Sequence, residues 1–337
     1  MIHSKISFIS YFLPEQILTN QDLVTIFPEK TEEIILKSFG IRKRHIREPK
    51  QTGSDLAYLA AQNFFFEHPD FEKNKIDFLI FCTEGLDYKA PTSSSVLHYR
   101  LGLNQNCGCI DMPMGCAGYV YGLSLANAMI VSGNATNVLL LVSDIPSSVI
   151  HSNDVDLRCI FGDAGAATLI QASEKKGIGS FVFGNDGEGA KNLIVERGST
   201  RAPIDKEWIE INKNEPEYLA HGKMEMNGLE IARFSLQRVP GLLEDTLKKN
   251  ELTFDEIDLF VFHQASKFIL SALQRKCKIP KEKFYEYYEY VGNTVSCSIP
   301  IALKHAEKEG KLKSGYKVML LGFGVGYSWG GTIIEWD

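Results

Sequence analysis

The sequence predicts an α/β fold built from two duplicated halves, and three observations support this prediction. Short apolar runs at 76–82 and 257–263 have the pattern of buried strands. A second pair of apolar runs lies at 138–142 and 318–322. The interval from 76 to 257 is almost the same as that from 138 to 318, which places both halves in nearly one register.

The segments between these strands have helical patterns, at 116–131 and at about 296–309, again related by the same interval. Apolar strands that alternate with helices are typical of sheets covered on both faces. We expect an N-terminal half at 1–172, which carries the cysteine discussed below, and a C-terminal half at 173–337. Because no flexible, low-complexity linker separates them, the halves are expected to form one rigid body.

The composition indicates a globular protein rather than a disordered or membrane-spanning one. Of 337 residues, 44% are hydrophobic and 23% charged, and no apolar run reaches the roughly 20 residues that cross a bilayer. Seven cysteines fit free thiols in a reducing compartment, so we expect a cytoplasmic location. The net charge of -6 gives no general attraction to nucleic acid, and no such partner is expected.

Two polar segments are notable. The most polar stretch, 199–227, is predicted to be a surface loop or cap. A local basic cluster has two interpretations, a solvated helix end or a docking site for an acidic carrier or a phosphate. It comprises Arg275, Lys276, Lys278, Lys281 and Lys283.

Cys116 is the candidate nucleophile. It follows a strand-like run at 109–112 and opens a helix, where the helix dipole and unpaired amides favour a thiolate. This position predicts a lowered thiol pKa, and its small neighbours leave room for a thioester. The alternative is an inert buried cysteine, as expected for Cys82 and Cys159.

Two further candidates lie in the second half. His263 ends the strand at 257–263, and Asn293 lies in the turn before the helix at 296–309. Taken singly, the histidine could be a satisfied structural residue and the asparagine a cap or turn residue. In the duplication, His263 occupies the position equivalent to Cys82, and the Asn293 turn is equivalent to the region of Cys116. Pseudo-symmetry would therefore bring the candidates to one cleft.

The glycine-rich segment 322–330 is predicted to be a loop before a last short strand at 332–336. It is not a dinucleotide-binding fingerprint, because no helix follows it. Gly324 and Gly326 are instead expected to let backbone amides approach a substrate carbonyl. The pair Cys107 and Cys109 has too few partners for zinc. We expect no metal, flavin or nicotinamide cofactor.

These segments together resemble the ketoacyl-ACP synthase III family of the thiolase superfamily, over essentially the whole chain. Further matching segments are Gly40-Ile41-Arg42-Lys43-Arg44, Phe161-Gly162-Asp163-Ala164-Gly165-Ala166 and Lys223-Met224-Glu225-Met226-Asn227-Gly228. The resemblance implies a thiolase-like, five-layered αβαβα body. It also implies a homodimer that pairs near the strand at 107–112.

The resemblance implies an acyltransferase that works with acyl carrier protein (ACP). Cys116 would accept an acyl group, and His263 and Asn293 would donate hydrogen bonds to the carbonyl of malonyl-ACP. Loss of carbon dioxide would give a carbanion that attacks the thioester and forms a β-ketoacyl product. The backbone N–H groups of Cys116 and Val325 would form the oxyanion hole.

Several positions depart from the family pattern. Ile34 and Ser38 replace a tryptophan and an arginine that hold the adenine of coenzyme A, and Val155 replaces a second arginine. We therefore expect an acyl-ACP donor. Phe268 stands where the carrier dock has a basic residue, with Lys267 beside it.

The acyl-pocket loop also departs from the family pattern. At Ala90-Pro91 the alanine replaces a frequent phenylalanine, which predicts room for an acyl chain longer than acetyl. We expect the enzyme to act in a specialised lipid or secondary-metabolite pathway.

Two other functions remain open at this point. The same fold could move the acyl group from Cys116 to an amine or hydroxyl acceptor, with His263 as a general base. The chain could also be a non-catalytic partner subunit of a heterodimeric synthase. Such subunits tend to lose the nucleophile, histidine or asparagine, whereas this chain retains all three.

Overall fold

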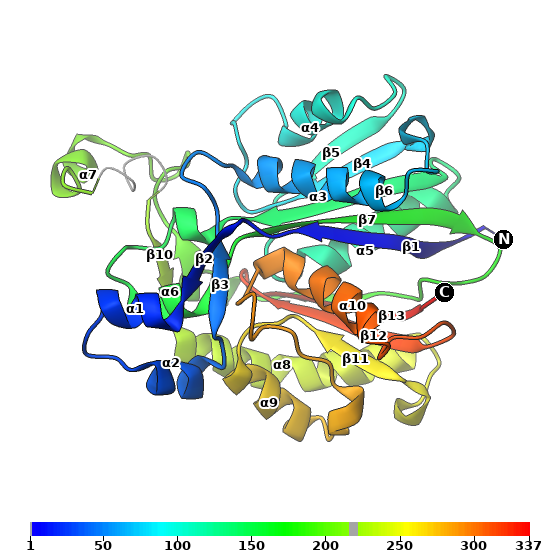
Figure 1. The fold of residues 1–337 in the computed structure, drawn as a ribbon. Coiled ribbons are helices and arrows are strands. Elements are labelled where there is room, and N and C mark those ends of the chain that lie inside the picture. The colour runs from blue at the N-terminus through cyan, green and yellow to red at the C-terminus, as the bar shows by residue number, and fades with distance from the viewer. Residues whose placement is uncertain (1, 216–221) are drawn as a thin grey trace.

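The computed structural model describes residues 2–215 and 222–337. Two mixed sheets lie one above the other, and helices α5 (Gly118–Val131) and α10 (Ser298–Lys308) lie between them (Figure 1). The outer face of the upper sheet is covered by α3 (Gly53–Glu67) and α4 (Ser93–Leu101). The outer face of the lower sheet is covered by α8 (Gly228–Lys249) and α9 (Lys267–Lys276). The predicted α/β architecture of five layers is confirmed.

The first sheet has the strand order β1-β7-β6-β4-β5. Strands β4, β5 and β6 are parallel, whereas β7 pairs antiparallel with both β1 and β6. These strands are β1 (His3–Phe12), β4 (Phe78–Cys82), β5 (Gly108–Met112), β6 (Asn137–Asp144) and β7 (Ala164–Ser173).

The second sheet has the order β11-β12-β13-β8 and, among the described residues, repeats the first without a counterpart of β5. Its strands are β8 (Val182–Asn185), β11 (Leu259–Phe262), β12 (Lys317–Gly324) and β13 (Ser328–Glu335). The parallel pair β11–β12 matches β4–β6, and α10 begins at the position in the second half that corresponds to the start of α5. The predicted repeat of strand, helix and strand is therefore present.

One sequence prediction is wrong here. The glycine-rich segment is mostly strand, because β12 and β13 pair continuously from Lys317–Glu335 to Gly324–Ser328. Only residues 325–327 form the connecting turn. Glycine weakens a strand, and it is retained where another backbone must come close.

The remaining elements lie around the site or at the surface. They are β2 (Gln16–Thr19), α1 (Asn20–Ile26), α2 (Glu32–Phe39), β3 (Lys43–Ile46), α6 (Val155–Ile160), β9 (Leu193–Val195), α7 (Lys206–Ile211) and β10 (Met224–Met226). The predicted polar loop therefore contains α7, which stands away from the body in Figure 1, and β10, which pairs with β9. Residues 216–221 of that loop lie outside the described residues. Within the described part, no helix is long and apolar enough to cross a membrane.

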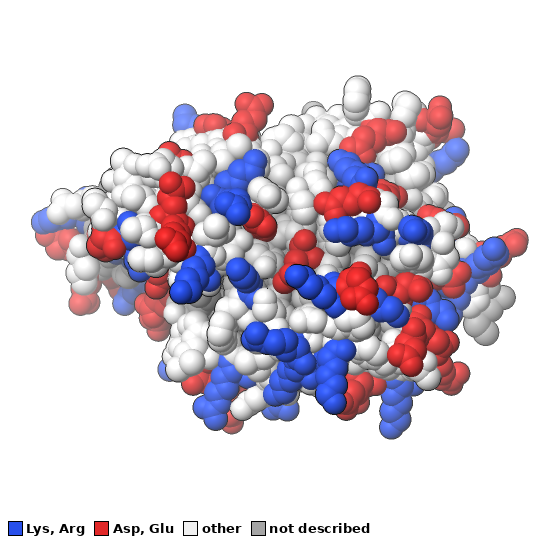
Figure 2. Space-filling model, turned by 60° about the horizontal axis from the view of Figure 1, so that its bottom comes forward, with Lys and Arg blue, Asp and Glu red and all other residues white. Residues whose placement is uncertain are grey.

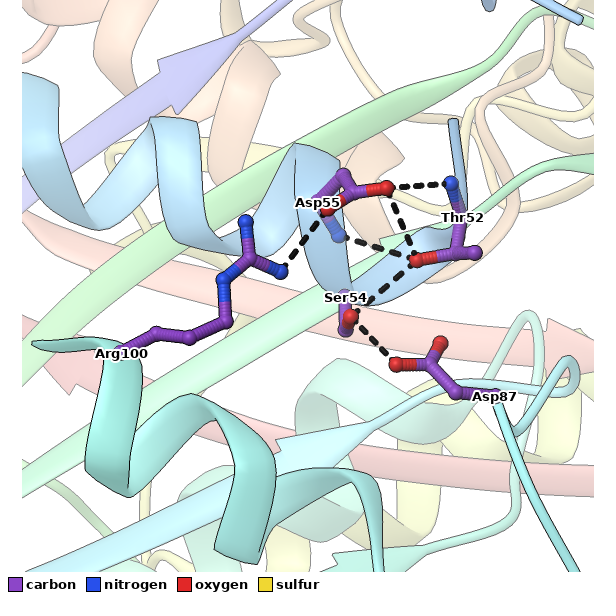
Figure 3. A network of polar contacts seen from close by, with 5 residues as sticks. All are labelled: Thr52, Ser54, Asp55, Asp87 and Arg100. Carbon is purple, nitrogen blue, oxygen red and sulfur yellow. Dashed lines mark hydrogen bonds and ion pairs between the residues drawn. The ribbon is translucent and has the colours of Figure 1, made fainter. Parts of the chain in front are cut away.

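A polar network fixes the loop between β4 and α4 (Figure 3). Thr52 caps α3 in a reciprocal pair with Asp55, and Arg100 of α4 contacts the same carboxylate at 2.8 Å. Ser54 donates a hydrogen bond of 2.5 Å to Asp87 in the loop. The start of α3 therefore holds both α4 and the loop that precedes it.

Arg44 is fully buried and joins three segments. Its guanidinium donates hydrogen bonds to Asn20 Oδ1 at 2.9 Å, to the carbonyl of Leu18 at 3.2 Å and to the carbonyl of Cys159 at 2.6 Å. Burial lowers the pKa of Arg44 to about 10, so the group remains charged at neutral pH. The arginine that ends the motif at 40–44 therefore has a structural role, which is to join these three segments.

We expect Arg44→Met to lower the free energy of unfolding by about 3 kcal/mol or more, because it removes the donor from two buried acceptors and one half-buried acceptor. Chemical denaturation followed by circular dichroism measures this change. Arg42→Met is the control, since the side chain of Arg42 makes an exposed ion pair with Glu289 and its loss should matter little. Equal stability of the Arg44 variant and wild type would contradict the expectation.

Candidate active site

Cys116 lies in the short segment between β5 and α5 and is 5% exposed. The end of β12 packs directly against it: a Cβ added to Gly324 would lie 2.5 Å from Cys116 Cβ and 2.6 Å from its Sγ. A Cβ on Gly322 would lie 2.9 Å from Ala117 Cα. These close approaches explain the strand glycines, because any side chain at 324 would displace the thiol.

The expected lowering of the Cys116 pKa is wrong. Burial raises the pKa of this thiol well above its usual range, and the Glu84 carboxylate raises it further. Backbone hydrogen bonds from Val325 and from Cys116 itself favour the thiolate and lower the pKa, but they do not outweigh burial. The resting thiol is therefore protonated, and a nearby base must activate it.

His263 directly follows β11, is 2% exposed and packs edge-on against Phe323. Burial lowers the pKa of His263 to about 3, so the imidazole is neutral. Its Nδ1 lies 2.8 Å from Ser298 Oγ, which also accepts the N–H of Gln264 at 3.3 Å. Because a hydroxyl both donates and accepts, Ser298 can support either neutral tautomer.

Asn293 is fixed by its main chain to the first half. Its N–H donates to the carbonyl of Ile160 at 2.8 Å, and its carbonyl accepts the N–H of Gly162 at 3.1 Å. Its side-chain oxygen accepts the N–H of Val295 at 2.9 Å. This bond orients the amide, so the NH₂ group remains as the donor available to a ligand.

One cavity of about 400 Å³ brings Cys116, His263 and Asn293 together. It lies among the ends of α2, α8 and α9, and its walls are mainly apolar. The large apolar side chains that line it include Phe39, Leu193, Met226, Leu229, Ile231, Phe268 and Ile269. Two serine hydroxyls on its wall have local partners, since Ser235 donates to the carbonyl of Ile231 and Ser266 caps α9.

The predicted substrate-binding residues are placed unevenly. Phe268 and Gly324 line the cavity, but Lys267 and Gly326 do not. Ala90 and Pro91 lie on the exposed loop before α4 and are also absent from its walls. The roles given to these residues by the resemblance stay predictions.

Sequence reasoning missed Ser298 and Asp144. Ser298 is 35 residues from the histidine that it contacts, and Asp144 is 152 residues from Ser296, whose N–H and hydroxyl it accepts. The only available signal for Asp144 was a carboxylate close after the apolar run at 138–142.

The fold and the site together define an acyl-transferring enzyme of the condensing class. Residues 110–187 match the family model "3-Oxoacyl-[acyl-carrier-protein (ACP)] synthase III", and residues 247–336 match its C-terminal model. The chain belongs to the 3-oxoacyl-[acyl-carrier-protein] synthase III family, and the resemblance read from its motifs is confirmed.

Individual relatives support this membership. The chain is 33% identical to β-ketoacyl-[acyl-carrier-protein] synthase III 2 of Halalkalibacterium halodurans, over 99% of this chain and 96% of the relative. It is similar to a crystal structure of 3-oxoacyl-(acyl-carrier-protein) synthase III, with a TM-score of 0.92, 41% identity, and coverage of 99% and 100%. A priming β-ketosynthase from the R1128 polyketide biosynthetic pathway has a TM-score of 0.88 at 27% identity, with coverage of 99% and 96%.

Proposed function

We propose that the protein transfers an acyl group to Cys116 and condenses it with malonyl-ACP, with loss of carbon dioxide. The observation that carries this proposal is the apolar cavity lined by Cys116, His263 and Asn293 together. A thiol, a neutral imidazole and an oriented amide are the groups that this two-step chemistry requires.

In the first step, the neutral His263 takes the proton of the Cys116 thiol. The thiolate attacks the donor thioester, and the leaving carrier thiolate receives that proton from the imidazolium. The backbone N–H groups of Cys116 and Val325, which already favour negative charge beside this sulfur, would stabilise the oxyanion. The products are acyl-Cys116 and a free carrier thiol.

In the second step, malonyl-ACP places its thioester carbonyl between His263 and Asn293. Hydrogen bonds from the imidazole Nε2–H and the amide NH₂ stabilise the enolate that forms when carbon dioxide leaves. The enolate carbon attacks the acyl thioester, and the C–S bond to Cys116 breaks. The product is β-ketoacyl-ACP, and the Cys116 thiolate regains a proton from solvent.

We further propose an acyl-ACP donor and a specialised pathway. The rim of the cavity carries Leu229 and Phe268, which are 78% and 60% exposed, rather than groups that bind a nucleotide. Ile34, one turn before Ser38 on α2, is also exposed. A polar nucleotide gains little from such a rim. Similarity to a priming ketosynthase of a polyketide pathway supports a specialised role.

The carrier partner, the homodimer and the cytoplasmic location are also proposals. Figure 2 shows lysine and arginine side chains gathered along the lower part of the face that carries α8 and α9. Within the predicted basic cluster, however, Lys283 donates to the carbonyls of Asp255 and Ile257 and so has a structural role. For the homodimer, β5 is an edge strand with an exposed Ile110.

The test is a reconstituted assay with malonyl-ACP and matched acyl donors, from acetyl to dodecanoyl, on ACP or on coenzyme A. We expect β-ketoacyl-ACP and carbon dioxide, with ACP donors at least about tenfold better in kcat/KM than their coenzyme A counterparts. Equal use of both carriers would contradict the donor proposal alone. Acyl-enzyme without condensation would favour transfer to an amine or hydroxyl, and no acyl-enzyme from any donor would favour a partner subunit.

A further inference from the structure

The duplication relates two equivalent contacts, each between the end of a strand and the start of a central helical segment. Cys116 corresponds to Ser296 and Asp144 to Gly324, by the same interval that relates 138 to 318. In one contact the end of β12 meets Cys116 through Gly324. In the other, the end of β6 meets Ser296 through Asp144. Gly324 therefore leaves space beside the thiol, whereas Asp144 fills the equivalent space beside Ser296 with a carboxylate.

Asp144 is 3% exposed, and both of its carboxylate oxygens are used. Oδ1 accepts the N–H of Glu84 at 2.9 Å, from the loop after β4. Oδ2 accepts the N–H of Ser296 at 3.1 Å and also the Ser296 hydroxyl. A buried carboxylate with this set of donors joins a strand of the first half to a turn of the second.

The turn that Asp144 holds is strained. Val295 has a φ of +52°, which is unfavourable for a β-branched residue. The N–H of Val295 orients the Asn293 amide, and the Val295 backbone also makes a hydrogen bond with His263. Such a conformation persists only when its surroundings restrain it, and the next residue along the chain, Ser296, is the one bound by Asp144.

We propose that Asp144 is a positioning residue for condensation: from the first half it holds the strained backbone at 295–296, and through the Val295 N–H it orients the amide of Asn293. This inference rests on the proposed condensing function. Acylation depends less on Asp144, because Cys116 packs against the end of β12 and His263 keeps Ser298 as a partner. Loss of Asp144 should therefore affect the two half-reactions unequally.

Asp144→Asn tests this separation. The NH₂ group of the new amide must face either the Glu84 N–H or the two Ser296 donors. The hydrogen bonds on that side are lost, because a donor there replaces an acceptor. We expect single-turnover condensation of preformed acyl-enzyme with malonyl-ACP to slow by about tenfold or more. Acylation of Cys116, followed by intact mass with the best donor, should change by less than about threefold.

Asp77→Asn is the matched control. One oxygen of Asp77 accepts three hydrogen bonds, from the N–H and hydroxyl of Thr136 and the N–H of Asn137, at the other end of β6. Its loss should not separate the two half-reactions. Ser296→Ala, which removes only the hydroxyl bond, should reproduce the separation more weakly and provides the test if Asp144→Asn does not fold.

Equal slowing of both half-reactions in the Asp144 and Ser296 variants, or a loss of thermal stability with neither rate changed, would overturn the positioning role. A wild-type protein that is acylated but never condenses would instead refute the proposed function. These two failures are distinguishable, because the second one is seen before any variant is made.

Discussion

Cys116→Ala protein is expected to gain no acyl mass from any donor and to form no β-ketoacyl product. Among the described residues that line the cavity with His263 and Asn293, Cys116 supplies the only thiol. In other covalent enzymes, loss of the nucleophile lowers kcat by about 10⁴-fold or more. Intact mass spectrometry after exposure to the donor panel measures the adduct directly.

Cys277→Ala is the control for this experiment. Cys277 is a free, half-buried cysteine at the end of α9 that does not line the described cavity, and its removal should leave the adduct unchanged. Acylation that survives in Cys116→Ala and disappears in Cys277→Ala would show that the nucleophile has been assigned to the wrong thiol.

Asn293→Asp is expected to retain acylation and to lose condensation by about 10²–10³-fold. The new carboxylate can still accept the Val295 N–H, so the turn keeps its hydrogen bond. Its second oxygen, however, replaces an NH₂ donor with an acceptor that repels the developing enolate. Release of carbon dioxide from malonyl-ACP by preformed acyl-enzyme measures this step.

Asn134→Asp introduces the same change of charge at an exposed loop and should leave both steps intact. If Asn293→Asp lowers acylation and condensation to the same extent, the residue supports the fold of the site rather than the enolate. In that case thermal denaturation should show a matching loss of stability.

The fold could be predicted from the sequence because the same apolar runs occur in both halves of the chain. The segments at 76–82 and 257–263 correspond to β4 and β11, and the second pair corresponds to β6 and β12. Such runs depend on burial alone, which a local pattern reports directly. The motifs also predicted the correct family.

What the sequence could not give depends on contacts between distant residues. The pKa of Cys116 is set by how deeply the thiol is buried and by Glu84, from the loop after β4, rather than by the helix start alone. Ser298 was not singled out, and Arg44 was quoted only as part of a motif, because the role of a hydroxyl or guanidinium is known only once its partners are known. The glycine-rich segment was assigned to a loop because nothing local showed that another backbone presses on it.

The contact between Gly324 and Cys116 also bears on how catalysis can be lost within such a fold. Asp144 and Ser296 show what the equivalent position contains when a side chain occupies it: two hydrogen bonds that join the two halves of the fold. A single side chain at position 324 would fill the space beside Cys116 and displace its thiol, although the cysteine would remain in the sequence. One substitution therefore separates an enzyme from a silent scaffold, and retention of a cysteine is not by itself a record of activity.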